Sequence, residues 1–134
     1  MIVQLKYATL PVPLGMVAVH YWFNVVDPDS AACDRWEVWQ RKNAGGASVG
    51  HVHCNLKAPD DGVGGGPARL ATEWTGDTAH KIFSILQRAW KEYPYRDRYL
   101  PWPGPNSNTF VAWVLRAAGI EFPLPWKAIG KDFT

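Results

Sequence analysis

The segment from Gly15 to Val26 (GMVAVHYWFNVV) is the sequence feature that most constrains how this chain can fold. It is short, rich in Val and aromatic residues, and followed by the turn formers Asp27-Pro28-Asp29-Ser30, so a β-strand closed by a turn is predicted. Apolar residues fall on both faces of such a strand. A strand that is apolar on both faces is buried on both, and we therefore expect it to be central in a sheet.

Further strands are predicted on either side of a glycine-rich loop. Cys33–Arg41 shares the β-favouring composition, and the turn before it suits an antiparallel hairpin. Another strand is predicted at Val49–Leu56, and a short strand or turn at Leu70–Trp74. Between these two, Ala58–Pro67 (APDDGVGGGP) is predicted to be a mobile loop. It lacks the Lys and Ser or Thr that a phosphate loop carries after its last Gly, so nucleotide binding is not expected there.

Two helices are predicted in the second half of the chain. The first has an apolar stripe at three- and four-residue steps and ends at Tyr93-Pro94, with Thr75, Asp77 or Thr78 to cap its start. Its stripe consists of Ala79, Ile82, Phe83, Leu86, Ala89, Trp90 and Tyr93. The second helix has Asn106 or Ser107 as its N-cap and Gly119 as the left-handed residue after its end. Its stripe consists of Phe110, Val111, Val114, Leu115 and Ala118. The predicted class is α+β, with a small antiparallel sheet packed with two main helices.

Length and composition indicate one soluble domain over residues 1–134. The 134 residues are 47% hydrophobic and 19% charged, with a formal net charge of +2 and no cluster of Lys and Arg, so nucleic acid is not the expected partner. No apolar stretch is long enough to span a bilayer, and no secretory signal is visible, so a cytoplasmic location is expected. Cys33 and Cys54 are expected as thiols, and no cofactor is expected.

Ser107 fits two roles. As a residue that opens a helix, it is an ordinary capping group. The same position suits a nucleophile, because the unpaired N–H groups and the dipole of a helix N-terminus stabilise negative charge on it and on an oxyanion.

His20 likewise fits a structural or a functional role. An imidazole within an apolar strand requires hydrogen bonds, and a general base requires an orienting partner. Glu37 and Gln40 on the next strand are the candidates for that partner. The sequence therefore predicts His20 facing Ser107 across a cleft, with Glu37 or Gln40 behind the ring.

Two other groups of residues are weaker candidates for a site. His51 and His53 alternate onto one strand face and could bind a metal, but the chain offers no second Cys/His pair at finger-like spacing. The eight Trp residues exceed what one small core holds, so some are expected to line a groove. Trp102 and Trp22 are the candidates for ligand binding, together with Asn106 and Asn108.

Two runs in the last third of the chain resemble a known family. WPGPNSNTFVAWVL at Trp102–Leu115 and LPWKAIGKDF at Leu124–Phe133 resemble the C-terminal signature of a bacterial family known as domain of unknown function 3750. The AVHYWF and RWEV segments look like that family's N-terminal half.

More distantly, the order of parts is similar to the circularly permuted papain-like hydrolases, such as the NlpC-type amidases. This resemblance implies a papain-like fold with Ser107 in place of the usual Cys nucleophile, His20 as the base and Glu37 as the third polar residue. It implies an amide or ester hydrolase or acyltransferase. The alternative is a catalytically inactive module that binds a peptide, a cell-wall fragment or a protein partner. A serine is far less acidic than a cysteine and depends on its base to lose a proton.

Overall fold

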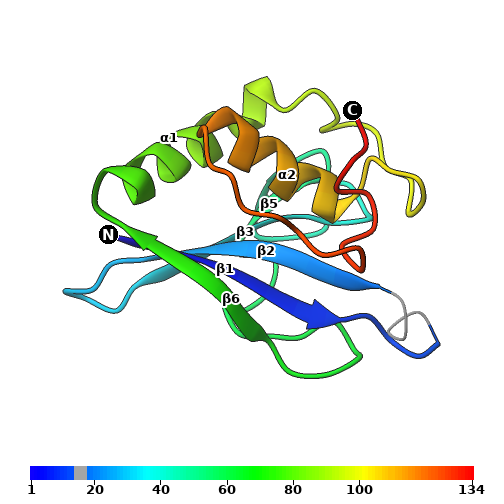
Figure 1. Ribbon diagram of the computed structural model, residues 1–134, viewed down its shortest axis with the longest axis horizontal. Coiled ribbons are helices and arrows are strands. Elements are labelled where there is room, and N and C mark those ends of the chain that lie inside the picture. The colour runs from blue at the N-terminus through cyan, green and yellow to red at the C-terminus, as the bar shows by residue number, and fades with distance from the viewer. Residues whose placement is uncertain (14–17) are drawn as a thin grey trace.

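A computed structural model describes residues 1–13 and 18–134. Its strands are β1 (Ile2–Thr9), β2 (Val19–Val26), β3 (Cys33–Val38), β4 (Ala47–Val49), β5 (Val52–Cys54) and β6 (Arg69–Thr75), and its helices are α1 (Gly76–Glu92) and α2 (Ser107–Ala117). The strands form one sheet in the order β4-β5-β3-β2-β1-β6, and all neighbours pair antiparallel. Both helices lie over the same face of this sheet (Figure 1). The predicted α+β class, with an antiparallel sheet and two main helices, is confirmed.

Several predicted strands have different bounds in the structure. β2 begins at Val19, and residues 15–17 of the predicted strand lie outside the described residues. β3 ends at Val38 and not at Arg41. The strand predicted at Val49–Leu56 is instead part of a hairpin of β4 and β5, because Gly50 turns the chain there with a φ of +62°.

β1 has no counterpart among the sequence predictions. It lies between β2 and β6 and pairs with both. Val3 and Leu5 are fully buried, and they alternate with Gln4 and Lys6. Alternation of apolar and polar residues with a period of two is typical of a strand, and this pattern at the start of the chain could have predicted β1.

The two helices follow the predicted patterns. α1 buries the face that carries Ala79, Ile82 and Leu86, and it ends at Tyr93, whose N–H donates to the carbonyl oxygen of Ala89. The N-cap of α2 is Asn106, and Ser107 is the first helical residue. Beyond the end of α2, Gly119 has a φ of +69° and serves as the left-handed residue that the sequence predicts.

β2 is buried on both faces, as its sequence predicts. Tyr21, Phe23 and Val25 belong to the apolar core beneath the helices. The residues between them, Trp22 and Asn24, alternate onto the opposite face and donate hydrogen bonds to the Pro59 carbonyl oxygen. The loop that contains Pro59 therefore covers that face.

The loop from Ala58 to Pro67 has neither helix nor strand, yet its first residues are held in place. Arg35 donates hydrogen bonds to the carbonyl oxygens of Ala58 and Asp61, and Lys6 pairs with Asp60 at 2.9 Å. Its first half is thus attached to the sheet by charged side chains.

Candidate functional site

A pair formed by His20 and Glu37 is the centre of the candidate site. His20 Nε2 lies 2.6 Å from Glu37 Oε2, and the two side chains are 4% and 0% exposed. The residues are contributed by neighbouring strands, β2 and β3. Gln40, the other candidate for orienting His20, is exposed and lies beyond the end of β3. Of the two candidates, the structure brings Glu37 to His20.

The charge state of Glu37 fixes the role of each nitrogen of His20. Burial disfavours the charged carboxylate, but the hydrogen bond and charge of His20, and the charge of Arg35, outweigh burial and hold the pKa of Glu37 below its usual range. An ionised carboxylate only accepts hydrogen bonds, so Nε2 of His20 carries the proton. In the neutral ring the free lone pair is then on Nδ1, which is the atom that can act as a base.

Arg35 is a residue of this site that the sequence predictions missed. It is fully buried beside Glu37, with Nη2 at 3.0 Å from Oε2. Its Nε is 2.9 Å from Oε1, close enough for an ion pair although its N–H points too far off that line for a hydrogen bond. Arg35 precedes Glu37 by two positions on one strand, so both side chains share a face. That spacing is the signal that identifies it.

Stability alone gives little reason for a buried group of this kind. Removing two charges from water is expensive, and an apolar pair of similar volume is often as stable or more stable. Titratable groups that are buried together and perturb one another are typical of functional sites. The cluster of His20, Glu37 and Arg35 is therefore the part of the described structure best suited to carry chemistry.

Ser107 lies at the start of α2 and is 6% exposed. Among the described residues, its hydroxyl has no hydrogen-bond partner, and no hydrogen bond joins it to His20. The side chain of Asn106 accepts the backbone N–H groups of Asn108 and Thr109, so those two groups are already paired. The N–H of Asn108, at the helix N-terminus where an oxyanion could bind, is thus engaged in the cap.

Asn108 docks the start of α2 onto the strand that carries His20. Its Oδ1 accepts the N–H of Tyr21 at 3.1 Å, and its Nδ2 donates to the carbonyl oxygens of Val19 at 2.8 Å and Ile129 at 3.0 Å. The groups of Val19 and Tyr21 lie on either side of His20 in β2, and that of Ile129 belongs to the C-terminal segment. The first turn of α2, which contains Ser107, is therefore anchored to β2 at the level of His20.

The fold and the site can now be compared with known proteins. A family model described as a protein of unknown function (DUF3750) matches residues 1–133. The chain belongs to this family. The match includes β2, β3 and α2, and thus His20, Glu37 and Ser107. No curated protein and no solved structure matches the chain.

His51 and His53, the weak metal candidates, both bond to the backbone. His51 Nδ1 lies 2.8 Å from the Trp39 carbonyl oxygen, and His53 Nδ1 lies 2.8 Å from that of His51. His53 Nε2 accepts the N–H of Ala44 at 3.0 Å, which requires a neutral ring. Burial lowers the pKa of His53, in agreement with that role. Within residues 1–13 and 18–134, no three His, Cys, Asp or Glu side chains are arranged to hold a metal ion.

The candidate binding tryptophans differ in their surroundings. Trp22 is fully buried and lies under the guanidinium of Arg35, 3.8 Å from its ring centre, so it supports the cluster from within. Trp102 is 75% exposed, and Trp126, which the sequence analysis did not single out, is 67% exposed. Asn106 Nδ2 donates to the carbonyl oxygens of Pro101 and Ile129, so the segments that carry both exposed rings meet at the start of α2.

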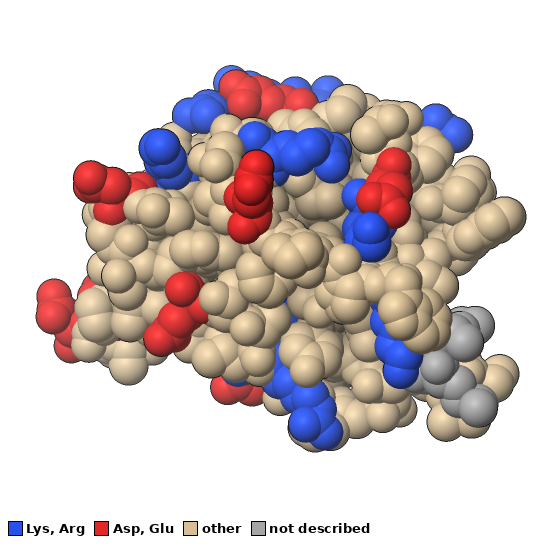
Figure 2. Space-filling view, viewed as in Figure 1, with Lys and Arg blue, Asp and Glu red and all other residues tan. Residues whose placement is uncertain are grey.

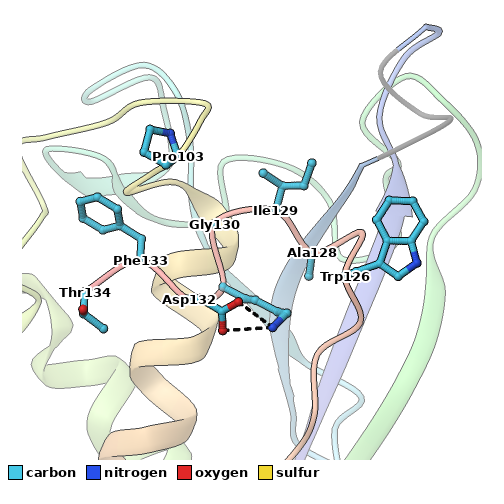
Figure 3. Close-up of a pocket in the computed structure, with 9 residues that line it drawn as sticks. Pro103, Trp126, Ala128, Ile129, Gly130, Asp132, Phe133 and Thr134 are labelled. Atoms are coloured by element: carbon cyan, nitrogen blue, oxygen red, sulfur yellow. Dashed lines mark hydrogen bonds and ion pairs between the residues drawn. The ribbon is translucent and has the colours of Figure 1, made fainter.

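A hollow of about 570 Å³ lies along the C-terminal segment, lined by Pro103, Trp126 and residues 128–134. Figure 3 shows this segment passing the helix, with Phe133 and Pro103 at one end and the ring of Trp126 pointing away at the other. Neither Ser107 nor His20 lines it. The hollow is thus separate from the cluster of His20, Glu37 and Arg35.

The surface gives two further observations about partners. On the face shown in Figure 2, Lys and Arg side chains are interspersed with Asp and Glu and form no continuous basic stripe. No helix in the described part of the chain has both the length and the apolar character needed to cross a bilayer.

Proposed function

We propose that this protein catalyses hydrolysis or acyl transfer on an amide or ester, with Ser107 as the nucleophile, His20 as the general base and Glu37 as the residue that orients it. The pair of His20 and Glu37, buried at 2.6 Å, is the observation that carries the proposal. In this pair one ring nitrogen of His20 is engaged by a carboxylate and the other is available, which is what a general base requires.

In the proposed reaction, Ser107 would reach His20 through an interruption in the sheet. α2 packs on the helix-covered face, whereas His20 projects towards the face of Glu37. Pairing of β2 with β3 extends only to Phe23 and Trp36 among the described residues, so β2 is unpaired on that side at Val19–Tyr21. Asn108 enters at this position. We infer that this gap is where the serine hydroxyl reaches Nδ1 of His20.

The proposed reaction follows the usual two steps of acyl transfer. The Ser107 oxygen bonds to the substrate carbonyl carbon while its proton moves to Nδ1 of His20, and that proton then passes to the leaving amine or alcohol as the old bond breaks. Water or another acceptor then attacks the acyl carbon while His20 takes its proton, and the Ser107 oxygen leaves and regains that proton. Since Asn106 takes the N–H groups of Asn108 and Thr109, the N–H of Ser107 and the dipole of α2 are left to stabilise the oxyanion.

The order of these parts supports a circularly permuted papain-like architecture. A strand histidine comes first, an acidic residue on the next strand follows, and the nucleophile opens a later helix. Serine at this position lacks the acidity of a cysteine, so the proposed activity depends on His20 and Glu37 more strongly than a thiol enzyme would.

A second candidate function is binding without catalysis, and two observations favour it. The Asn108 N–H donates to Asn106 in the helix cap, so one fewer N–H group is available to stabilise an oxyanion. Trp102 and Trp126 present exposed rings on the segments that flank α2, and such rings bind apolar or flat ligands well. In this role the protein would hold a peptide or a cell-wall fragment beside the C-terminal segment.

Labelling with a fluorophosphonate separates the two candidates. An activated serine oxygen bonds to phosphorus, fluoride leaves, and the proton goes to the base. We expect stoichiometric labelling of the wild type that Ser107→Ala abolishes and that the matched surface variant Ser30→Ala leaves unchanged. His20→Gln should slow labelling by about 10²-fold or more, since general-base catalysis contributes about 10²–10⁴-fold. Absence of labelling in the folded wild type would favour the binding module.

A further inference from the structure

The guanidinium of Arg35 contacts a carboxylate, two backbone carbonyl groups and an aromatic ring. Its Nε and Nη2 face the two oxygens of Glu37 at 2.9 and 3.0 Å. Its Nη1 donates to the carbonyl oxygens of Ala58 at 2.8 Å and Asp61 at 2.7 Å. The face of Trp22 lies 3.8 Å from its centre, so the group is paired along its edge and covered on one face.

This arrangement also fixes the carboxylate of Glu37. Nη2 donates a hydrogen bond to Oε2 and Nε forms an ion pair with Oε1, so the planar guanidinium faces both oxygens and restricts the carboxylate more than a point charge would. With the carboxylate restricted in this way, Oε2 remains directed at Nε2 of His20, 2.6 Å away. The orientation of the His20 ring therefore depends on Arg35 through Glu37.

We propose that Arg35 is a positioning residue that keeps Glu37 ionised and correctly oriented, and thereby keeps the proton of His20 on Nε2 and the base on Nδ1. The inference rests on the proposed function of His20. It adds a residue that has no counterpart in the triad expected from the sequence, and it assigns a purpose to the attachment of the loop at Ala58–Asp61.

A merely structural role for Arg35 has a different consequence. If Arg35 only fastened the loop, its loss would lower stability and leave the protonation of Glu37 and His20 unchanged. If it positions Glu37, its loss leaves a buried carboxylate with less support for its charge, so Glu37 takes up a proton at higher pH. The hydrogen bond from Nε2 to a less firmly held Glu37 is also weaker, so the ring proton is shared between Nε2 and Nδ1.

The test is nuclear magnetic resonance of the folded full chain, which needs no substrate. The side-chain carboxyl ¹³C signal of Glu37 reports its titration, and the ring ¹⁵N signals of His20 report which nitrogen carries the proton. In Arg35→Met we expect the Glu37 midpoint to rise by about one pH unit or more and the Nε2–H signature of the His20 ring to weaken. The matched variant Arg88→Met, on the exposed face of α1, should change neither signal.

Arg35→Lys keeps the positive charge but not the planar guanidinium, and it replaces Arg35→Met as the test variant if Arg35→Met does not fold. We expect it to weaken the Nε2–H signature of His20 and to slow fluorophosphonate labelling about tenfold, part of the general-base contribution. Unchanged Glu37 and His20 signals in Arg35→Met, or in Arg35→Lys if only that variant folds, would overturn the inference. If the wild type is never labelled, the proposed reaction fails, while the two signals still decide the role of Arg35.

Discussion

Replacing Asn108 with alanine tests how α2 is attached to the sheet. The side chain is 3% exposed and makes three hydrogen bonds, to the backbone of Tyr21, Val19 and Ile129. At about 1 kcal/mol each, with a further penalty for the buried backbone groups of Val19 and Tyr21 left unpaired, the loss is about 3–4 kcal/mol. Alanine is a better helix former by about 0.5 kcal/mol. We therefore expect Asn108→Ala to lower the free energy of unfolding by about 3 kcal/mol.

Urea denaturation followed by tryptophan fluorescence measures this change, with the midpoint and the slope fitted separately. Gln87→Ala is the matched control, since it removes an amide from an exposed helical position. Asn108→Asp keeps the acceptor for Tyr21 but faces two carbonyl oxygens without a donor, so it should be at least as destabilised as the alanine variant. A loss in Asn108→Ala of less than about 1 kcal/mol would refute this account of the docking of α2.

Two further predictions concern the C-terminal segment and acid stability. Gly130 has a φ of +98°, and a Cβ there would overlap the side chain of Asn106, so Gly130→Ala should lower the free energy of unfolding by about 2–3 kcal/mol in the same assay. Gly119 has a φ of +69° and open space around it, so Gly119→Ala should lower it by only about 1 kcal/mol. Equal losses in the two variants would contradict this reasoning. The pKa of His53 is lowered in the folded state, so below about pH 6.5 the unfolded chain binds the proton more tightly and stability falls as pH decreases. His53→Gln cannot titrate, so its free energy of unfolding should fall less between pH 7.5 and 5.5 than that of the wild type.

Local patterns predicted most of the helices and strands. The period of apolar residues identified α1 and α2. Gly119 marked the end of α2 because glycine adopts a positive φ easily, and its φ in the structure is positive. Apolar residues on both faces identified β2 as a central strand. β1 was missed although Val3 and Leu5 alternate with polar residues. The strand predicted at Val49–Leu56 is part of the hairpin of β4 and β5, because the turn that the single glycine Gly50 makes was not recognised.

The candidate site was predicted in part. His20 and Glu37 were proposed as partners, and the structure brings them to 2.6 Å. Arg35 was not proposed, although its spacing of two from Glu37 places it on the same face. The contact of Ser107 with His20 stays a prediction, to be tested by labelling.

The sequence alone determined the class of fold, the two helices, and the residue types available for chemistry, since each follows from the order of neighbours along the chain. Only the tertiary structure decided that the buried histidine is paired with one carboxylate and that this carboxylate is held by an arginine under the loop at Ala58–Asp61. These contacts join residues on different strands and in a loop, so they depend on how the strands pair and where the loop closes over the sheet. No local pattern encodes either of these.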